Sequence, residues 1–477
     1  MRNRRWALSL CAALCATASM VAADDWPQFR GPNGNSLPTF GKLPTEWAKD
    51  KNVQWKVEVP GVAWSSPIII GDKIIVTTAI TEKQQKPKPF VFGGGPGGPP
   101  GGRPGGFPGG RPAGPPGGGR PGGPPGGFPG MGGGGKPPDA TYRWEVHCLD
   151  RNTGKTLWKA TAIEKKPAVA THPTNTYASE TPVSDGERVY VYFGMTGVFC
   201  FDLNGKQIWS KDLGAYKMMF GWGTGSSPVL LGDRLFVQCD NEEKSFLVAL
   251  DKKTGDEIWR KERPEKSSWS TPYIWKTKDR TELVCLSAKK VISYDPATGD
   301  VIWELNGLNG GCNASPVADE SMIYVGNGGP FGNSPLFAVK AGAKGDISLK
   351  EGQKSGEYVA WMRNQSGPSM SSPLLYRGNL YIFDQNGGTV SCYDASTGKE
   401  AYRKERLPRS RGITASPWAY DGKIFCTDED GRTFVLQAGN EFKVLATNKL
   451  DDMFWSSPAF ANETVIFRGR DYLYCIK

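Results

Sequence analysis

A serine or threonine followed by proline recurs at regular intervals along the 477 residues of this chain. From Pro182 onward the intervals between successive prolines of this motif are 46, 44, 44, 57, 44 and 41 residues. Such a period is typical of the four-stranded blade of a β-propeller. The first interval, 115 residues, is longer because it contains a low-complexity insertion. The eight copies that form this series are Ser66-Pro67, Thr181-Pro182, Ser227-Pro228, Thr271-Pro272, Ser315-Pro316, Ser372-Pro373, Ser416-Pro417 and Ser457-Pro458; Ser334-Pro335 falls outside the series.

Each repeat consists of four short apolar runs separated by turn residues. In the copy that begins at Ser227 the runs cover residues 227–231, 234–239, 245–250 and 257–261. A glycine before the fourth run recurs in several copies and permits the positive φ of a tight hairpin. The sequence therefore predicts an all-β fold: a single eight-bladed β-propeller of four-stranded antiparallel blades, formed by residues 24–477. These glycines are Gly154, Gly205, Gly255, Gly299 and Gly398.

Most fourth runs carry tryptophan at one register, where an indole can dock between adjacent blades. Residues 458–477 provide only three strands for the last repeat, whereas the segment around Trp55 is a fourth strand without a repeat of its own. We therefore expect the N-terminal strand to join the C-terminal blade and close the ring, which removes an open sheet edge. The expected docking residues are Trp55, Trp158, Trp209, Trp259, Trp303 and Trp361.

The first 23 residues have the pattern of a secretory signal peptide. Three arginines among the first five residues precede an apolar run over residues 6–21, and small residues follow. The apolar run is short for a membrane span, which favours cleavage near Ala23 over a retained anchor. We expect a periplasmic or secreted protein with no transmembrane segment in the mature chain.

Residues 81–138 are a basic insertion rich in glycine and proline, without glycine at every third position as collagen requires. Because it has few groups to bury, we expect a disordered loop between the second and third strands of the first blade. Of the formal net charge of +10, the first 23 residues contribute +3 and the insertion +6. The remaining chain is nearly neutral, so no nucleic-acid partner is predicted.

Several cysteines stand two residues before the aspartate of a turn, as Cys148, Cys200 and Cys392 do. Ala249 and Ser293 fill this position in other copies, which indicates a place for a small buried side chain. Equivalent positions on neighbouring blades lie too far apart for a disulfide, so we expect buried thiols.

Three segments of the chain resemble the pyrroloquinoline-quinone (PQQ) type of propeller repeat, with its aspartate, Thr-Gly turn and tryptophan. They are residues 149–158, 250–259 and 294–303. Motifs near the two ends resemble those of secreted BamB-like proteins, related to an outer-membrane assembly factor. These end motifs are residues 25–32, 454–458 and 468–471. The resemblance covers nearly the whole mature chain except the insertion and a degenerate stretch at residues 340–358.

The resemblance implies one of two functions. Quinoprotein dehydrogenases hold PQQ and calcium in the central funnel, whereas BamB-like proteins bind no quinone and present loops and channel mouth to protein partners. This chain has no adjacent cysteine pair and little length for the insertions that roof quinoprotein active sites. We therefore expect a monomeric, non-enzymatic binding or scaffold protein with envelope or outer-membrane partners and no cofactor. The alternative is a PQQ- and calcium-dependent alcohol or sugar dehydrogenase.

The sequence predicts no catalytic residue and no metal ligand. His147 and His172 are the only histidines, which leaves little for a zinc site or a Ser-His-Asp triad. Glu180 and Asp384 are acids that could face calcium, but spacing alone cannot assemble an oxygen cage from them.

The position three residues before each repeat proline is where the chain enters an innermost strand, so the eight positions should surround one mouth of the axial channel. Their chemistry varies between blades, as expected of a recognition surface, although structural packing of the ring is the alternative. This predicted ring is Trp64, Ser179, Gly225, Trp269, Asn313, Met370, Thr414 and Trp455. The adjoining connections add aromatic and cationic residues suited to a protein or anionic ligand. They are Tyr177, Lys217, Phe220, Trp222, Arg363, Arg409 and Arg411.

Overall fold

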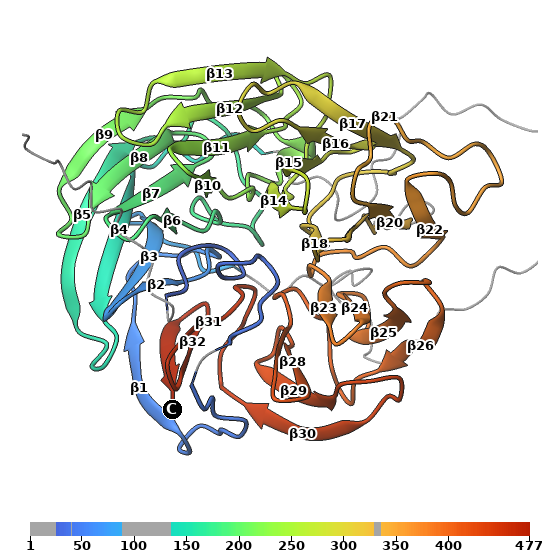
Figure 1. Cartoon of the computed structure of the whole chain (residues 1–477). Helices are drawn as coiled ribbons and strands as arrows, with labels where there is room; N and C mark the ends of the chain where they lie inside the picture. The colour runs from blue at the N-terminus through green and yellow to red at the C-terminus, as the bar shows by residue number, and fades with distance from the viewer. Residues whose placement is uncertain (1–24, 40, 88–134, 329–334) are drawn as a thin grey trace, which may run out of the picture.

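The computed structural model describes residues 25–39, 41–87, 135–328 and 335–477, which form eight β-sheets arranged around one axis (Figure 1). The predicted signal peptide and most of the predicted insertion lie outside the described residues. Within each sheet the strands that follow one another along the chain pair antiparallel. The prediction of an all-β, eight-bladed β-propeller is therefore confirmed.

The blades follow the chain, and we number them from the first repeat. The strands of blades 1 and 2, from the axis outward, are β2 (Ile68–Ile70), β3 (Lys73–Ile80), β4 (Tyr142–Asp150) and β5 (Thr156–Lys165), then β6 (Val183–Ser184), β7 (Arg188–Phe193), β8 (Gly197–Asp202) and β9 (Gln207–Lys211). Those of blades 3 and 4 are β10 (Val229–Leu231), β11 (Arg234–Cys239), β12 (Phe246–Asp251) and β13 (Glu257–Glu262), then β14 (Tyr273–Lys276), β15 (Thr281–Leu286), β16 (Lys290–Tyr294), β17 (Val301–Asn306) and β21 (Gly345–Asp346).

Blades 5 and 6 contain β18 (Val317–Ala318), β19 (Met322–Gly326), β20 (Leu336–Lys340) and β22 (Val359–Arg363), then β23 (Leu374–Tyr376), β24 (Asn379–Asp384), β25 (Thr389–Asp394) and β26 (Glu400–Arg406). Blades 7 and 8 contain β27 (Trp418–Tyr420), β28 (Lys423–Thr427), β29 (Arg432–Gln437) and β30 (Val444–Lys449), then β31 (Ala459–Ala461), β32 (Thr464–Arg468), β33 (Tyr472–Ile476) and β1 (Val53–Glu58).

The ring closes by pairing the two ends of the chain. Strand β1 runs antiparallel to β33, with Trp55 opposite Cys475 and Glu58 opposite Tyr472. In Figure 1 this pairing places the blue N-terminal strand on the outside of the red C-terminal blade. The predicted closure is confirmed.

Five of the six predicted docking tryptophans lie on the glycine turn of the next blade, which is Thr-Gly in four cases and Asn204-Gly205 in the case of Trp158. The indole N–H of Trp158, for example, donates to the carbonyl oxygen of Leu203 at 2.9 Å. The glycine of each turn has a positive φ, and a Cβ atom there would lie under 3.0 Å from the indole, as at Gly205. Glycine therefore serves both the turn and the close approach of the neighbouring blade. The five are Trp55, Trp158, Trp209, Trp259 and Trp361.

Trp303 is placed differently. Its side chain is completely buried, and its indole N–H donates at 2.6 Å to Glu282 Oε2 within the same blade. In blade 5 the degenerate stretch at residues 340–358 replaces the Thr-Gly turn, so Trp303 has no such turn to pack on. Instead β21, from that stretch, pairs parallel with β17 at Trp303 and gives blade 4 a fifth strand. The expectation of four strands in every blade is corrected here.

The hydroxyls of the Ser-Pro and Thr-Pro motifs link neighbouring blades. The backbone N–H of Ser66 donates to Thr181 Oγ1, the N–H of Thr181 donates to Ser227 Oγ, and the pattern continues around the axis. Seven such links are present at 2.9–3.1 Å, the last from the N–H of Ser457 back to Ser66 Oγ. The motif therefore recurs because each blade needs a side-chain acceptor for the N–H of its neighbour. We call these eight side chains the hydroxyl ring.

An N-terminal segment, residues 25–37, crosses one end of the ring. Its backbone pairs with Ile69 of blade 1, and the Arg30 guanidinium donates to the carbonyl oxygens of Pro316 and Pro373 in blades 5 and 6. Arg30 is almost completely buried, so these two acceptors offset part of the cost of burying its charge. This strap, as we call residues 25–37, therefore fastens blades on opposite sides of the axis.

The cysteine prediction is confirmed, because all eight cysteines among the described residues are free and buried. The insertion was expected between the second and third strands of blade 1. Its described flanks agree with that position, since β3 ends at Ile80, β4 begins at Tyr142, and the two strands pair.

Candidate binding site in the axial cavity

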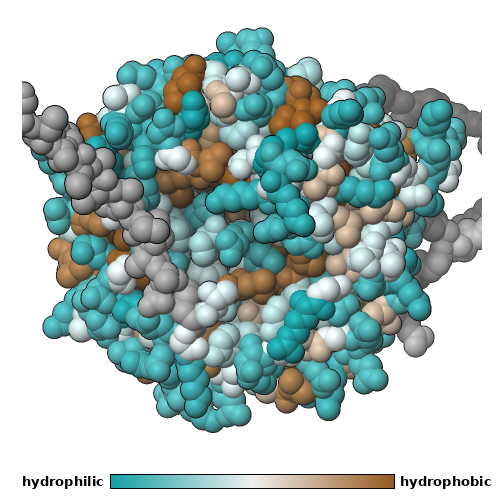
Figure 2. Space-filling model, viewed as in Figure 1, coloured by the Kyte–Doolittle hydropathy of each residue, from teal (hydrophilic) through white to brown (hydrophobic). Residues whose placement is uncertain are grey.

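A cavity of about 230 Å³ lies on the propeller axis. All eight residues of the predicted ring line it, and so do all eight residues of the hydroxyl ring. Phe29 of the strap also lines it, and the same side chain borders a second hollow that the strap lines. The cavity is therefore closed by the strap at one end and faces the predicted mouth at the other. In Figure 2 the periphery is mostly hydrophilic, whereas hydrophobic side chains gather near the centre.

Two pairs of tryptophans line the cavity. Trp64 and Trp455 stack with ring centroids 5.3 Å apart, and Trp222 and Trp269 are tilted with centroids 5.7 Å apart. Backbone carbonyls fix two of these rings: the indole N–H of Trp64 donates to Thr174 at 2.8 Å, and that of Trp269 donates to Gly223 at 2.6 Å. The pairs are thus held in place before any ligand arrives.

Polar groups lie between the two aromatic pairs, and a buried carboxylate orients one set of them. Glu429 Oε1 accepts from Thr414 Oγ1 at 2.6 Å and from Gln385 Nε2 at 3.0 Å. Gln385 Nε2 also donates to Thr414 Oγ1 at 3.2 Å. Both amide hydrogens of Gln385 are therefore engaged, which leaves its carbonyl oxygen as an acceptor. Gln385 and Thr414 line the cavity, whereas Glu429 stands behind them.

The loop before blade 2 forms another polar part of the wall. Asn175 Nδ2 donates to the carbonyl oxygen of Trp222 at 2.7 Å, and Asn175 Oδ1 accepts from Ser179 Oγ at 2.6 Å. His172 lies beside this loop with Nδ1 2.7 Å from Thr174 Oγ1. Partial burial lowers the pKa of His172, so the imidazole is neutral at neutral pH.

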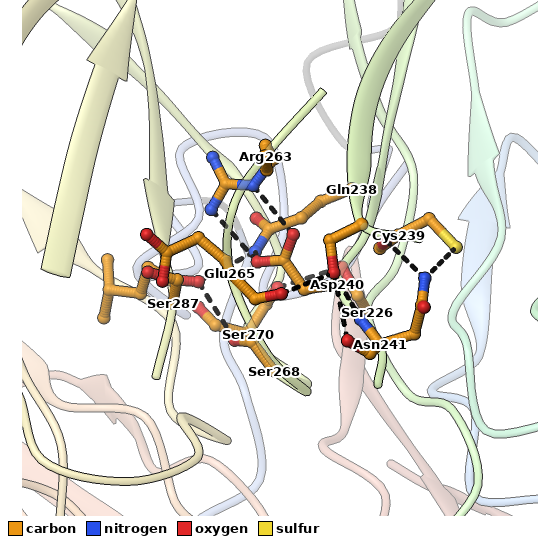
Figure 3. Close-up of polar contacts among 12 residues, drawn as sticks. Ser226, Gln238, Cys239, Asp240, Asn241, Arg263, Glu265, Ser268, Ser270 and Ser287 are labelled. Carbon is orange, nitrogen blue, oxygen red and sulfur yellow. Dashed lines mark hydrogen bonds and ion pairs between the residues drawn. The ribbon is translucent and has the colours of Figure 1, made fainter. Parts of the chain in front are cut away.

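A buried ion pair supports the wall next to Trp269 (Figure 3). Arg263 Nε and Nη2 donate to the two carboxylate oxygens of Asp240 at 2.7 and 3.0 Å, and neither side chain is exposed. Gln238 Nε2 also donates to Asp240 and to the carbonyl oxygen of Leu286, which in turn accepts from Ser268 Oγ. This network fixes the chain immediately before Trp269, so its charges are structural and lie outside the cavity.

The cavity itself carries no formal charge. Among the described residues, no aspartate, glutamate, lysine or arginine lines it. The same part of the chain contains no cluster of three or more His, Cys, Asp or Glu side chains able to hold a metal ion. Recognition here must therefore depend on aromatic contacts and neutral hydrogen bonds.

Glu180 is a buried carboxyl between the two cavity-lining residues Ser179 and Thr181. Its Oε1 accepts from the N–H of Gly194 at 3.2 Å. Burial, as the largest effect, raises the pKa of Glu180 from about 4.5 to about 7. Since the folded state holds this proton more tightly than the unfolded chain, the free energy of unfolding falls as pH rises from about 4.5 to about 7.

We expect a Glu180→Gln variant to lose this pH dependence. A pKa difference of this size corresponds to roughly 3 kcal/mol, so the variant gains that much relative to the wild type between pH 5 and pH 8. Urea denaturation at both pH values measures the difference. Glu164→Gln, on the exposed outer strand β5, is the control and should follow the wild type. Equal pH dependence of the wild type and Glu180→Gln would contradict the assignment.

Of the predicted rim residues, only Trp222 lines the cavity. Arg409 and Arg411 are exposed on the loop that leads to Thr414, and Lys217 and Phe220 are exposed near the short 3₁₀ helix η1 (Met219–Gly221). Tyr177 and Arg363 lie elsewhere. The hydroxyl of the buried Tyr177 donates to Val169, and Arg363 pairs with Glu400 and lies over the ring of Tyr393 on the outer side of the blades.

Several components of the cavity lining were not predicted as site residues: the hydroxyl ring and Phe29, His172, Thr174, Asn175, Thr224 and Gln385. The hydroxyls were read only as markers of the period, although their invariant position in every copy indicated a shared contact. Phe29 and Gln385 had no such signal, because the strap and the turn after β24 reach the axis only through tertiary packing.

The comparisons with known proteins agree with this fold. Residues 143–401, more than half of the chain, match the protein family described as outer membrane protein assembly factor BamB. A curated relative, tetrathionate hydrolase from Acidianus ambivalens, is 27% identical over 121 residues. That match covers 23% of this chain and only 22% of the relative's length.

Two solved quinoprotein structures are similar in fold. A europium-containing methanol dehydrogenase has a TM-score of 0.54 at 11% identity, covering 94% of this chain and 90% of the other. The quinohemoprotein alcohol dehydrogenase from Comamonas testosteroni has a TM-score of 0.56 at 11% identity, covering 95% and 81%. No helix within the described ranges has the length and apolar character needed to cross a bilayer. By the match over residues 143–401, the chain belongs to the family of the outer membrane protein assembly factor BamB, built on PQQ-type propeller repeats.

Proposed function

We propose that this protein is a non-enzymatic binding propeller of the cell envelope that presents the loops around its axial cavity to a protein partner. The observation that carries the proposal is the uncharged lining of the cavity. PQQ bears three carboxylates, and the described lining offers no arginine or lysine to pair with them and no acid to hold calcium. The described residues of the lining therefore do not fit the cofactor.

The loop that carries η1 has the features of a docking element. Phe220 is 51% exposed, whereas the other large hydrophobic side chains exposed in the described chain are aliphatic. Its backbone has φ 51°, a left-handed conformation that costs energy for a residue with a side chain. Lys217 is exposed on the same loop and pairs with Glu243, while Arg409 and Arg411 are exposed on the loop that leads to Thr414, where Arg411 pairs with Asp430. Aromatic and arginine side chains are enriched where proteins bind one another.

The quinoprotein alternative is favoured by the two structural neighbours, whose names place them among the dehydrogenases. Incubating the purified protein with PQQ and calcium, followed by dye-linked alcohol and aldose oxidation, tests it directly. We expect neither quinone uptake nor turnover. Stoichiometric uptake with turnover would overturn the proposal.

A pair of variants tests the docking element. Phe220→Ala should weaken retention of an envelope protein at least about tenfold, because interface aromatic anchors contribute roughly 2 kcal/mol or more. Leu157→Ala is the matched control, since Leu157 is also 51% exposed but lies on the outer strand β5. Quantitative pull-down from envelope extracts measures both. Equal recovery of the same outer-membrane protein by both variants would contradict the assignment of this loop.

A further inference from the structure

The chemistry of the cavity specifies a kind of ligand beyond the protein partner of the proposed function. The lining combines indole faces, amides, hydroxyls and one neutral imidazole, with no formal charge among its described residues. A charged ligand that left water for this cavity would lose its hydration without gaining a counter-charge. The occupant should therefore be neutral.

The aromatic pairs indicate a ligand with flat apolar faces. Trp455 and Trp269 belong to the entries of blades 8 and 4, which are four places apart in a ring of eight. These two rings therefore lie on opposite sides of the axis, and their partners Trp64 and Trp222 extend the aromatic wall on either side of the loop before blade 2. Aromatic faces bind apolar and C–H surfaces at modest energy without demanding a charge.

The hydrogen-bonding groups of the cavity lining indicate a ligand that both donates and accepts hydrogen bonds around its rim. The hydroxyl ring supplies donors, since none of its eight O–H groups donates to an acceptor within the described residues. Gln385 supplies an acceptor, because Glu429 and Thr414 take both of its amide hydrogens. Alcohol groups match both types at once. A ring with apolar faces and a rim of hydroxyls has this combination.

From these observations we infer that the axial cavity binds one sugar ring of a neutral saccharide, with the ring between Trp455 and Trp269 and its hydroxyls toward Gln385 and the hydroxyl ring. The cavity of about 230 Å³ is below the roughly 300–1,000 Å³ of pockets for drug-sized ligands, which limits it to one ring. Phe29 of the strap closes the inner end. The rest of an oligosaccharide therefore leaves through the open mouth.

Titration calorimetry with a panel of neutral disaccharides (cellobiose, maltose, lactose and chitobiose) tests this site. We expect at least one to bind at millimolar or lower concentration, and Trp455→Ala to weaken it about tenfold, which corresponds to about 1.4 kcal/mol of lost stacking. The indole N–H of Trp455 has no partner within the described chain, so this change removes a stacking face and no hydrogen bond. Gln385→Leu, which keeps the size but removes the acceptor, should weaken binding as well.

Phe220→Ala separates this inference from the proposed function, because Phe220 does not line the cavity. That variant should lose the protein partner and keep the saccharide, whereas Trp455→Ala should lose the saccharide. No binding of any panel member by the folded wild type would overturn the saccharide site and leave the docking loop unaffected. Equal saccharide affinity of the wild type and Trp455→Ala, or binding of galacturonate in preference to neutral sugars, would also overturn it.

Discussion

Replacing Trp303 with alanine is expected to lower the free energy of unfolding by about 3–5 kcal/mol, as for other large-to-small changes in protein cores. The Trp303 side chain is 0% exposed, and its indole N–H donates to Glu282, a carboxylate that is itself completely buried. The variant therefore creates a cavity and leaves a buried acceptor with fewer donors. Equilibrium denaturation with urea measures the loss.

Two further variants show whether burial decides the size of the effect. Trp259 is half-buried and packs on Gly299 of the next blade. Trp259→Ala should therefore lower the free energy of unfolding by less than Trp303→Ala does, but it should still lower the thermal midpoint clearly. Val301→Ala, at a side chain 56% exposed beside Trp303 in the same strand, should change stability by under about 0.5 kcal/mol. Unchanged midpoints for both tryptophan variants would contradict the view that these indoles hold the blades together.

Deleting residues 25–58 is expected to abolish cooperative folding. The deletion removes β1, which leaves the outer edge of blade 8 unpaired, and it removes the strap with the buried Trp26 and Arg30. An open sheet edge in the last blade invites pairing with other chains, so aggregation should accompany the loss. Circular dichroism melting and size-exclusion chromatography measure the result.

Deleting residues 90–138 is the matched control for this experiment. Residues 135–138, the described part of this segment, belong to no strand, and the flanking strands β3 and β4 pair directly with each other. We expect this deletion to retain a sharp unfolding transition. Cooperative folding of the chain without residues 25–58 would contradict the structural role assigned to β1 and the strap.

The architecture could be predicted from the sequence because it depends on repetition. Eight regularly spaced copies of a Ser-Pro or Thr-Pro motif set the number of blades, and the missing fourth strand at the C-terminus required a partner near Trp55. The five strands of blade 4 could not be predicted from the repeat. Its fifth strand, β21, comes from a stretch that resembles no repeat, and the unusual burial of Trp303 depends on that stretch.

In the candidate site, too, the residues whose position is set by the repeat could be predicted, and those placed by tertiary packing could not. The position three residues before each repeat proline was predictable as a ring because every blade enters the axis in the same way. The rim residues were assigned by proximity in sequence, and this failed for Tyr177 and Arg363. A shift of a residue or two along a connection carries a side chain from the channel mouth into the core or onto the outer face. Phe29 could be placed only once the strap was seen to cross the axis.

The closure of the ring by β1 and β33 is the central claim of this account, and a pair of cysteines tests it directly. Glu58 lies opposite Tyr472 in the two strands, within reach of a disulfide between Glu58→Cys and Tyr472→Cys. The eight native thiols of the described chain are buried and should not compete. After mild oxidation of the folded double variant, peptide mapping should find an intramolecular bond between positions 58 and 472, absent from Glu58→Cys alone. Two free, reactive thiols at these positions in the folded double variant would contradict the closure.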